Sequence, residues 1–430
     1  MTERPRRPTN QLQSQWFNLF LVSFLVLAAA MSQFSYAPMS PFLIDYFHLT
    51  KTQMGVLASA VFLGVITTTF IAGWMVDVVG VRKMILVGPG LMALSSIGVS
   101  MAHAYWVVFG WLFLLGVGNS VMMPLGNTAI FEWFRREQRG LAMGIKQSGM
   151  AAGPALGAAL LPGVSLAFGW QRGYQLAGLL LAGCTLLSYL FYRDPENPST
   201  VGLKQSVPSL AAIKEIFFNP DVWLVGIFGL SMGGAQVAFT TFSMPYFDEV
   251  LAIPVVTGGA LLALTQLSGA VGRPVFGMIS DRVFSGRRKG IMCMTAFAAV
   301  GFLVIMSFLS RGVHPGLLVA LMILMGLTIM GWAGPYFTLI VEVAGERNIG
   351  LVSSMAVTMN LIGIMSGPPL FGLIVDSTSS YRWAFRFFAL WLGIASLIFL
   401  FSRIERLGPL SLGEFFYKKW SRNRWTDSGL

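Results

Sequence analysis

The chain has 430 residues, of which 55% are apolar and 11% are charged, and its mean hydropathy is +0.70. Soluble proteins carry about 25% charged residues, so this composition excludes a set of water-facing domains and indicates a membrane protein. The net charge of +11 raises the question of nucleic acid, but the basic residues fall in the loops between apolar stretches, and we expect no nucleic-acid partner.

Apolar stretches long enough to cross a membrane recur along the whole chain. A crossing helix needs about 20 apolar residues, because the hydrocarbon core offers no hydrogen-bond partner to the backbone. We expect twelve such helices, over residues 16–39, 53–76, 84–101, 107–131, 141–168, 174–192, 222–247, 256–280, 291–309, 317–341, 351–375 and 383–401. Residues 1–15 are polar and the first stretch is long, so no cleaved signal peptide is predicted.

The distribution of Lys and Arg predicts the orientation of these helices. If residues 1–15 are cytoplasmic, 22 of the 29 Lys and Arg residues lie in segments on that side, five lie on the other side, and two lie within spans. We therefore expect both termini in the cytoplasm. The basic and aromatic residues 403–430 are expected to lie on anionic lipid at the membrane surface.

The two halves of the chain resemble each other at an offset of 204 positions, which aligns Pro41 with Pro245 and Asp77 with Asp281. This predicts an all-α membrane protein of two six-helix pseudo-repeats. The expected parts are an N-terminal tail (1–15), a first bundle (16–192), a cytoplasmic linker rich in Pro and Ser (193–220), a second bundle (221–402) and a basic tail (403–430).

A glycine-rich, charged motif follows both the second and the eighth span. It reads Gly73-Trp-Met-Val-Asp77-Val-Val-Gly80-Val-Arg82-Lys83 in the first half and begins Gly277-Met-Ile-Ser-Asp281-Arg282 in the second. The motif resembles the cytoplasmic signature of the major facilitator superfamily. We expect its glycines to allow close helix approach and its carboxylates to accept from basic groups or from a helix amino end. The predicted conformational latch comprises Gly73, Asp77, Gly80, Arg82, Lys83, Gly277, Asp281, Arg282, Gly286 and Arg287.

The segment from Gly116 to Gly157 resembles the fourth and fifth spans of superfamily members that carry small organic anions, such as monocarboxylates, oxalate, sugar acids or cyanate. Small residues recur in it at four-residue spacing, which is typical of tightly crossing helices. These are expected to be scaffold features, while the parallel six-helix repeat predicts a substrate site near the membrane midplane between the halves. The Arg found early in the fourth span of many such families is replaced here by Trp111 and Leu112, so no role of that Arg is transferred.

Arg273 and Lys146 are the two cations within predicted spans. A charge there costs roughly 2.5–3.5 kcal/mol and therefore tends to face a cavity. Arg273 lies in an Arg-Pro-x-x-Gly pattern that resembles monocarboxylate transporters, in which the Arg pairs with the substrate carboxylate; alternatively, it belongs to the latch with Asp281 or Asp77. Lys146 either faces the same cavity or extends to the inner interface.

Neutral polar and aromatic side chains complete the predicted cavity lining. They have hydrogen-bonding groups where lipid offers none, although each can instead hold helices together or lie at the membrane interface. They are Gln33, Tyr36, Asn119, Asn127, Gln236, Trp332, Tyr336 and Asn360. The superfamily resemblance places the first, fourth, seventh and tenth spans around the cavity, which favours all of them except Asn360.

The sequence contains no arrangement typical of an enzyme, a metal site or a bound cofactor. Cys184 and Cys293 lie far apart in apolar stretches, and no catalytic triad or metal-ligand cluster is apparent. We expect none of these functions. Carboxylates fall only near the ends of the spans, where Glu132 and Glu342 are candidates for proton coupling.

These observations favour a secondary active transporter that works by alternating access, as a monomer, in a bacterial inner membrane. Its expected function is proton-coupled uptake of a small organic anion of the monocarboxylate or sugar-acid class, because two mid-span cations face no mid-span carboxylate. One alternative is an efflux pump for drugs or lipophilic metabolites. Another is a transporter-like receptor that signals through its tail.

Overall fold

A computed structural model of the chain describes residues 9–193, 217–284, 287–402 and 404. Twelve helices among these residues are long and apolar enough to cross a membrane, which confirms the number of spans expected from the sequence. Residues 9–15 of the predicted N-terminal tail are described and helical, whereas residues 1–8, the predicted basic tail apart from residue 404, and most of the predicted linker lie outside the described residues. The predicted domain boundaries stay predictions.

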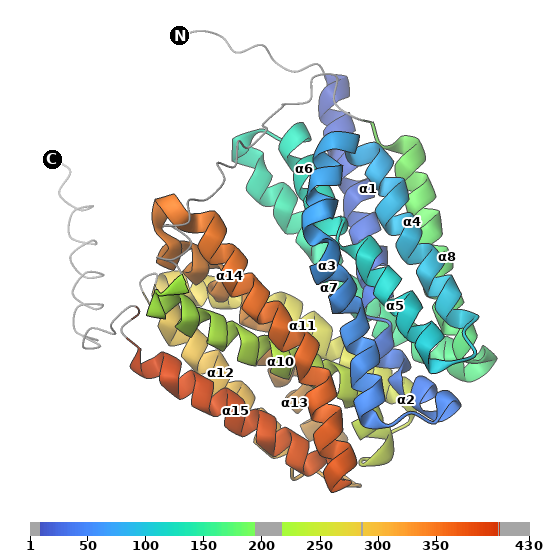
Figure 1. The fold of residues 1–430 in the computed structure, drawn as a ribbon, viewed down its shortest axis with the longest axis vertical. Helices are drawn as coiled ribbons and strands as arrows, with labels where there is room; N and C mark the ends of the chain where they lie inside the picture. The colour runs from blue at the N-terminus through green and yellow to red at the C-terminus, as the bar shows by residue number, and fades with distance from the viewer. Residues whose placement is uncertain (1–8, 194–216, 285–286, 403, 405–430) are drawn as a thin grey trace, which may run out of the picture.

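The helices form two bundles that follow each other along the chain (Figure 1). The first contains α1 (Thr9–Gln33), α2 (Tyr36–Phe47), α3 (Lys51–Val79), α4 (Val81–Ser100), α5 (Tyr105–Asn119), α6 (Met122–Trp133), α7 (Arg136–Phe168) and α8 (Trp170–Phe191). The second contains α10 (Pro220–Glu249), α11 (Val255–Arg282), α12 (Arg288–Met306), α13 (Pro315–Met325), the π-helix η1 (Gly326–Met330), α14 (Ala333–Thr378) and α15 (Tyr381–Phe401). Because the number of crossings is even, α1 begins and α15 ends on the same side, which we call the terminal end.

Three spans contain a break near their middle. The first span is interrupted at Phe34 between α1 and α2, and the fourth at Ser120 between α5 and α6. The tenth changes to the π-helix η1 and then breaks next to Gly331. A proline follows each of these residues by four positions and cannot donate the hydrogen bond that would continue the helix, so the chain bends there.

Helix α14 contains the second half of the tenth span and the whole of the eleventh. Its Tyr336 hydroxyl donates to the carbonyl of Ala356 at 3.2 Å. Twenty residues of straight helix would separate these groups by about 30 Å, so the chain must reverse direction between them. The two predicted spans 317–341 and 351–375 are therefore both present, as Pro315–Ala344 and Leu351–Thr378.

Glycines allow helices to cross at backbone contact within the first bundle. A Cβ at Gly116 of α5 would lie 1.9 Å from the carbonyl oxygen of Val61 on α3, and one at Gly64 of α3 would lie 2.1 Å from that of Phe113. Side chains of any size are thus excluded where α3 and α5 cross. This is how a membrane bundle gains packing energy where no hydrophobic effect drives the helices together.

The two bundles contact each other at the end opposite the termini and diverge toward the terminal end (Figure 1). Among the described residues, hydrogen bonds between the bundles join residues 40–59 of the first to residues 241–376 of the second. Gly55 and Gly372 add close contacts there, since Cβ atoms would lie 2.4 Å from the Pro368 oxygen and 2.3 Å from the Lys51 oxygen. The molecule is therefore closed at the end opposite the termini.

The crossing of α3 and α5 can be tested with two alanine substitutions on one helix. We expect Gly116→Ala to lower the free energy of unfolding by about 1–3 kcal/mol, because the new methyl group meets rigid backbone. The matched control is Gly110→Ala, where a Cβ would have no atom within 4 Å. It should leave stability equal or slightly raised. Thermal unfolding of the purified variants measures both, and equal midpoints would contradict this account of the crossing.

Candidate functional site

Two adjoining pockets lie near the middle of the helices. The N-bundle pocket is formed by α1, the α5–α6 junction and α7, and holds about 420 Å³ of empty space that is partly open to solvent. The central pocket lies between the bundles, holds about 490 Å³ measured in the same way, and is formed by residues of α7, α10, α11 and η1 together with Phe34. Met150 lines both, so the pockets meet at this side chain.

Helix α7 connects the two pockets through one stripe of its surface. Lys146 lines the N-bundle pocket, Met150 lines both pockets, and Pro154 lines the central pocket. Residues four positions apart lie on the same helix face, about 6 Å apart along the axis. The stripe therefore leads from a cation in the first bundle toward the space between the bundles.

Lys146 is buried, with 3% of its surface exposed, and its ammonium donates to the amide oxygen of Asn127 at 2.6 Å. Gly126 makes room for it, because a Cβ there would lie 2.8 Å from the Lys146 Cδ. No ion pair joins Lys146 to any residue that the structure describes. The side chain thus brings an uncompensated positive charge to the N-bundle pocket.

Arg273 is the second cation and lines the central pocket. Its Nε donates to the carbonyl oxygen of Met330 at 3.3 Å, and within the described part of the chain it forms no ion pair. Asp281, which the sequence offered as a latch partner, pairs with Arg288 instead. Among the described residues, no Asp or Glu lines either pocket.

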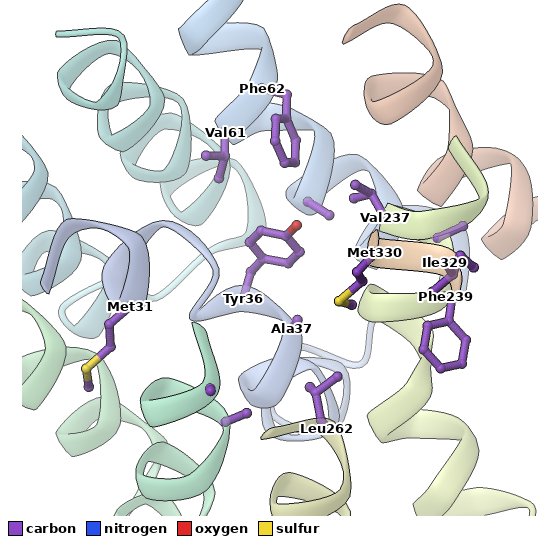
Figure 2. Close-up of a cluster of buried hydrophobic side chains, with 14 of the residues drawn as sticks. Met31, Tyr36, Ala37, Val61, Phe62, Val237, Phe239, Leu262, Ile329 and Met330 are labelled. Atoms are coloured by element: carbon purple, nitrogen blue, oxygen red, sulfur yellow. The ribbon is translucent and has the colours of Figure 1, made fainter. Parts of the chain in front are cut away.

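The central pocket reaches the break of the first span, where Phe34 lines it. Figure 2 shows Tyr36 between the bundles, with Val61 and Phe62 on one side and Val237 and Met330 on the other. Tyr36 is fully buried. It lines neither pocket.

The other predicted lining residues divide into three groups. Gln33 and Asn119 line the N-bundle pocket, and Gln236 lines the central pocket. Asn127 and Trp332 contact lining residues, since Asn127 accepts from Lys146 and Trp332 donates to Gln236 at 2.9 Å. Tyr336 and Asn360 bond to backbone carbonyls, of Ala356 and Gly229, and line neither pocket.

Gln147, Thr240 and Gln266 also line the pockets and were not predicted. Each is a polar residue within a predicted span, and this polarity is the sequence feature that could have identified it as a lining residue. Polarity alone, however, did not distinguish these residues from the many hydroxyl side chains that bond to the preceding turn of their own helix, as the Thr240 hydroxyl does to the Gln236 carbonyl at 2.8 Å.

The latch motif lies at the terminal end and differs between the two halves. In the second half, Arg288 pairs with Asp281 and, at 3.2 Å, with Glu342. In the first half, Asp77 is exposed and has no partner within the described residues, while Arg82 donates to the Tyr189 carbonyl at 3.2 Å. The predicted basic residues Lys83, Arg282 and Arg287 are exposed, and Gly286 lies outside the described residues.

The glycines of the motif do not serve the expected purpose in this conformation. A Cβ at Gly73 or at Gly277 would meet no atom within 4 Å, so the expected close helix approach is absent. At Gly80 the backbone conformation itself favours glycine. Its φ of +90° joins α3 to α4 in a conformation that residues with a side chain rarely adopt.

The carboxylates named for proton coupling, Glu132 and Glu342, line neither pocket. Glu342 faces Arg288 at the terminal end, as described above. A proton bound there is separated from the pockets by part of the bundle.

Twelve spans in two successive six-helix bundles, with pockets near the middle and one closed end, define a membrane transporter built from repeats. The sequence model of the Major Facilitator Superfamily matches residues 22–368 and 285–419, and the chain belongs to this superfamily. It is a transporter of this family and not an enzyme.

Relatives with named activities are distant in sequence but similar in length. The chain is 24% identical to the hexuronate transporter of Bacillus subtilis, over 85% of this chain and 90% of the relative. It is 23% identical to the probable sulfoacetate transporter of Cupriavidus necator, over 84% and 87%. A bacterial homologue of the human lysosomal transporter Spinster has the same fold, with a TM-score of 0.77 over 92% of this chain and 97% of that chain at 13% identity.

Because the charge of Lys146 is uncompensated, we expect that its removal does not lower the stability of the protein, unlike most substitutions of buried residues. We expect Lys146→Met to leave stability unchanged or raise it, by up to about 3 kcal/mol, because the substitution removes a buried charge that only a neutral amide contacts. The matched control is Lys289→Met. Lys289 is buried to the same extent, at 2% exposure, but donates at 2.7 Å to the carbonyl of Ser402, the C-cap of α15, where the negative end of the helix dipole compensates its charge. Its loss should lower the thermal midpoint. A midpoint that falls equally in both variants would show that Lys146 is structural.

Proposed function

We propose that the protein is a secondary active transporter for a small organic anion of the monocarboxylate or sugar-acid class. The observation that carries the proposal is the placement of Lys146 and Arg273. They come from opposite bundles, line adjoining pockets and form no ion pair within the described residues. A carboxylate or sulfonate can supply the missing negative charge, and the guanidinium fork of Arg273 suits its two oxygens.

The named relatives support an anionic substrate. Hexuronate and sulfoacetate, the substrates in the names of two of them, both carry acid groups, as does the L-galactonate of a third, in Escherichia coli. Glutamine and asparagine side chains in the two pockets add hydrogen-bonding groups for substrate hydroxyls.

Alternating access is the proposed mechanism, with the described conformation open toward the terminal end. The far-end network, which we define as Lys51, Thr52, Glu249, Asp376 and Tyr381, closes the other end. Asp376 accepts from the backbone N–H groups of Lys51 and Thr52 at 2.9 and 2.8 Å, at the positive amino end of α3. Glu249 pairs with Lys51 and accepts from the Tyr381 hydroxyl at 3.1 Å.

The excess of basic residues supports a cytoplasmic location for the terminal end, in the inner membrane of a bacterium. Uptake of an anion into a negative interior then opposes the membrane potential, by about 2.3 kcal/mol per charge at 100 mV. A proton moved with the anion cancels this charge, which is why proton symport belongs to the proposal. Each chain has its own pair of pockets, so one chain suffices as the working unit.

Binding of anions to the purified protein tests the proposal directly. Thermal unfolding is followed with glucuronate, galactonate, lactate, sulfoacetate and a cationic lipophilic drug. A ligand at a hundred times its dissociation constant stabilises by about 2.7 kcal/mol. We expect at least one organic anion to stabilise the parent and to have no effect on Arg273→Ala or Lys146→Ala.

The variant Arg172→Ala controls for the loss of one positive charge elsewhere in the protein. Arg172 bonds to Gln175 outside both pockets, so this variant should respond to the anion as the parent does. Stabilisation by the cationic drug alone, equal in all variants, would reject the anion transporter in favour of an efflux pump.

Weakening the far-end network should open the closed end. We expect Asp376→Asn to increase the population open at that end about tenfold or more, because charged hydrogen bonds at the α3 amino end are replaced by neutral ones. Spin labels at His48 and Ser377, both exposed on opposite bundles, report the separation by electron spin resonance in a background without Cys184 and Cys293. Asp221→Asn, at the terminal end, should leave the distances unchanged. Identical distance distributions in Asp376→Asn and the parent would refute the role of the network.

A further inference from the structure

Gln236 is half-buried, whereas every other residue of the stretch 231–247 on α10 is buried. Its side chain lines the central pocket, near Arg273 of α11, and its amide oxygen accepts from the indole Nε1 of Trp332 at 2.9 Å. An indole N–H is a donor only, so the group that faces it must be the amide oxygen. The orientation of this amide is therefore determined by chemistry, and its NH2 group is left for the pocket.

Trp332 is itself held rigidly. It is 3% exposed and lines neither pocket, and its ring packs against those of Tyr336 and Phe228, with centroid distances of 4.8 and 6.3 Å. A fixed donor thus holds the side-chain oxygen of Gln236 on the Trp332 side of the amide. If Trp332 did not hold it there, the amide could turn and offer its oxygen to the pocket or to a neighbouring guanidinium.

Arg273 presents donors to the same pocket. Its Nε is used by the Met330 carbonyl, and its two terminal nitrogens have no partner within the described part of the chain. The Arg273 fork and the Gln236 NH2 group together offer donors and no acceptor. A carboxylate or sulfonate, which only accepts, matches such a set, whereas a primary amide must place its own NH2 group against other donors.

We propose that Trp332 is a positioning residue that selects an acid group over its neutral amide in the central pocket, by holding the Gln236 amide with its NH2 group toward Arg273. This inference rests on the proposed anion transport and names the part of the pocket that recognises the acid group. The sequence predicted that Trp332 contacts the substrate. In this proposal Trp332 instead orients Gln236, and Gln236 contacts the substrate.

The experiment compares acids with their primary amides on the full-length protein. The probes are acetate and acetamide, lactate and lactamide, and glucuronate and glucuronamide, and affinities come from thermal-shift titrations. We expect Trp332→Phe to weaken acid binding about three- to tenfold, the loss of one hydrogen bond, and to leave amide binding equal or improved. In a Gln236→Ala background, Trp332→Phe should change acid binding less than twofold.

Packing effects are separated by Phe228→Leu, which disturbs the same aromatic cluster and keeps the indole N–H. This variant should lower the thermal midpoint without changing the ratio of acid to amide affinity. An equal loss of acid binding from Trp332→Phe in both backgrounds would overturn the positioning role, as would an unchanged ratio.

A second variant keeps the test valid if Trp332→Phe does not fold. Gln236→Glu retains an acceptor for the indole and turns the other oxygen, a negative one, toward Arg273. We expect it to bind acids more weakly than Gln236→Ala does, and equal binding would overturn the proposal. If no acid binds to the parent, both the proposed function and this inference fail. If an acid binds to the parent and not to Arg273→Ala, but Trp332→Phe leaves the ratio of acid to amide affinity unchanged, only this inference fails.

Discussion

The hydrocarbon core gives the backbone no hydrogen-bond partner, and this constraint determines where the pockets of this protein can be. A helix can break inside the membrane only where protein or water satisfies the freed groups. The three breaks of the chain obey this rule. Phe34 and Met330 line the central pocket, and Asn119 and Met122 line the N-bundle pocket. The prolines that interrupt the helices thus also mark the interior space around which the bundles are arranged.

The same constraint sorts the charges. Carboxylates and most cations lie at the ends of the spans, where ion pairs such as Arg288 with Asp281 and Glu342 form in contact with water and contribute little each. Lys146 and Arg273 are exceptions, because they lie near the middle and have only neutral partners among the described residues. A charge in that position costs stability, and the proposed function accounts for its presence by a ligand of opposite sign.

The sequence was sufficient to predict features that depend on composition along the chain. Twelve spans follow from apolar length alone, and Lys146 and Arg273 stand out because a charge within a span is rare. Features that depend on contacts between distant segments were not predictable. Trp332 and Gln236 are 96 positions apart, and Lys51 lies 325 positions from Asp376. Tyr336 and Asn360 were expected in the lining for their polarity, but polarity does not distinguish a pocket face from a helix interface, and both bond to backbone carbonyls instead.

The placement of one cation in each bundle has a consequence for the transport cycle, given the proposed function. Lys146 and Arg273 repel each other, and the repulsion grows as the bundles approach around Met150, since it is screened less in a closed, dry site. Without an anion, closure at the terminal end therefore costs free energy. An anion between the bundles replaces this repulsion by attraction, and it does so more strongly in the closed state than in the open one. A ligand shifts an equilibrium only through such a difference in affinity. Two cations on opposite bundles thus couple occupancy of the site to closure, which two cations on the same bundle would not do.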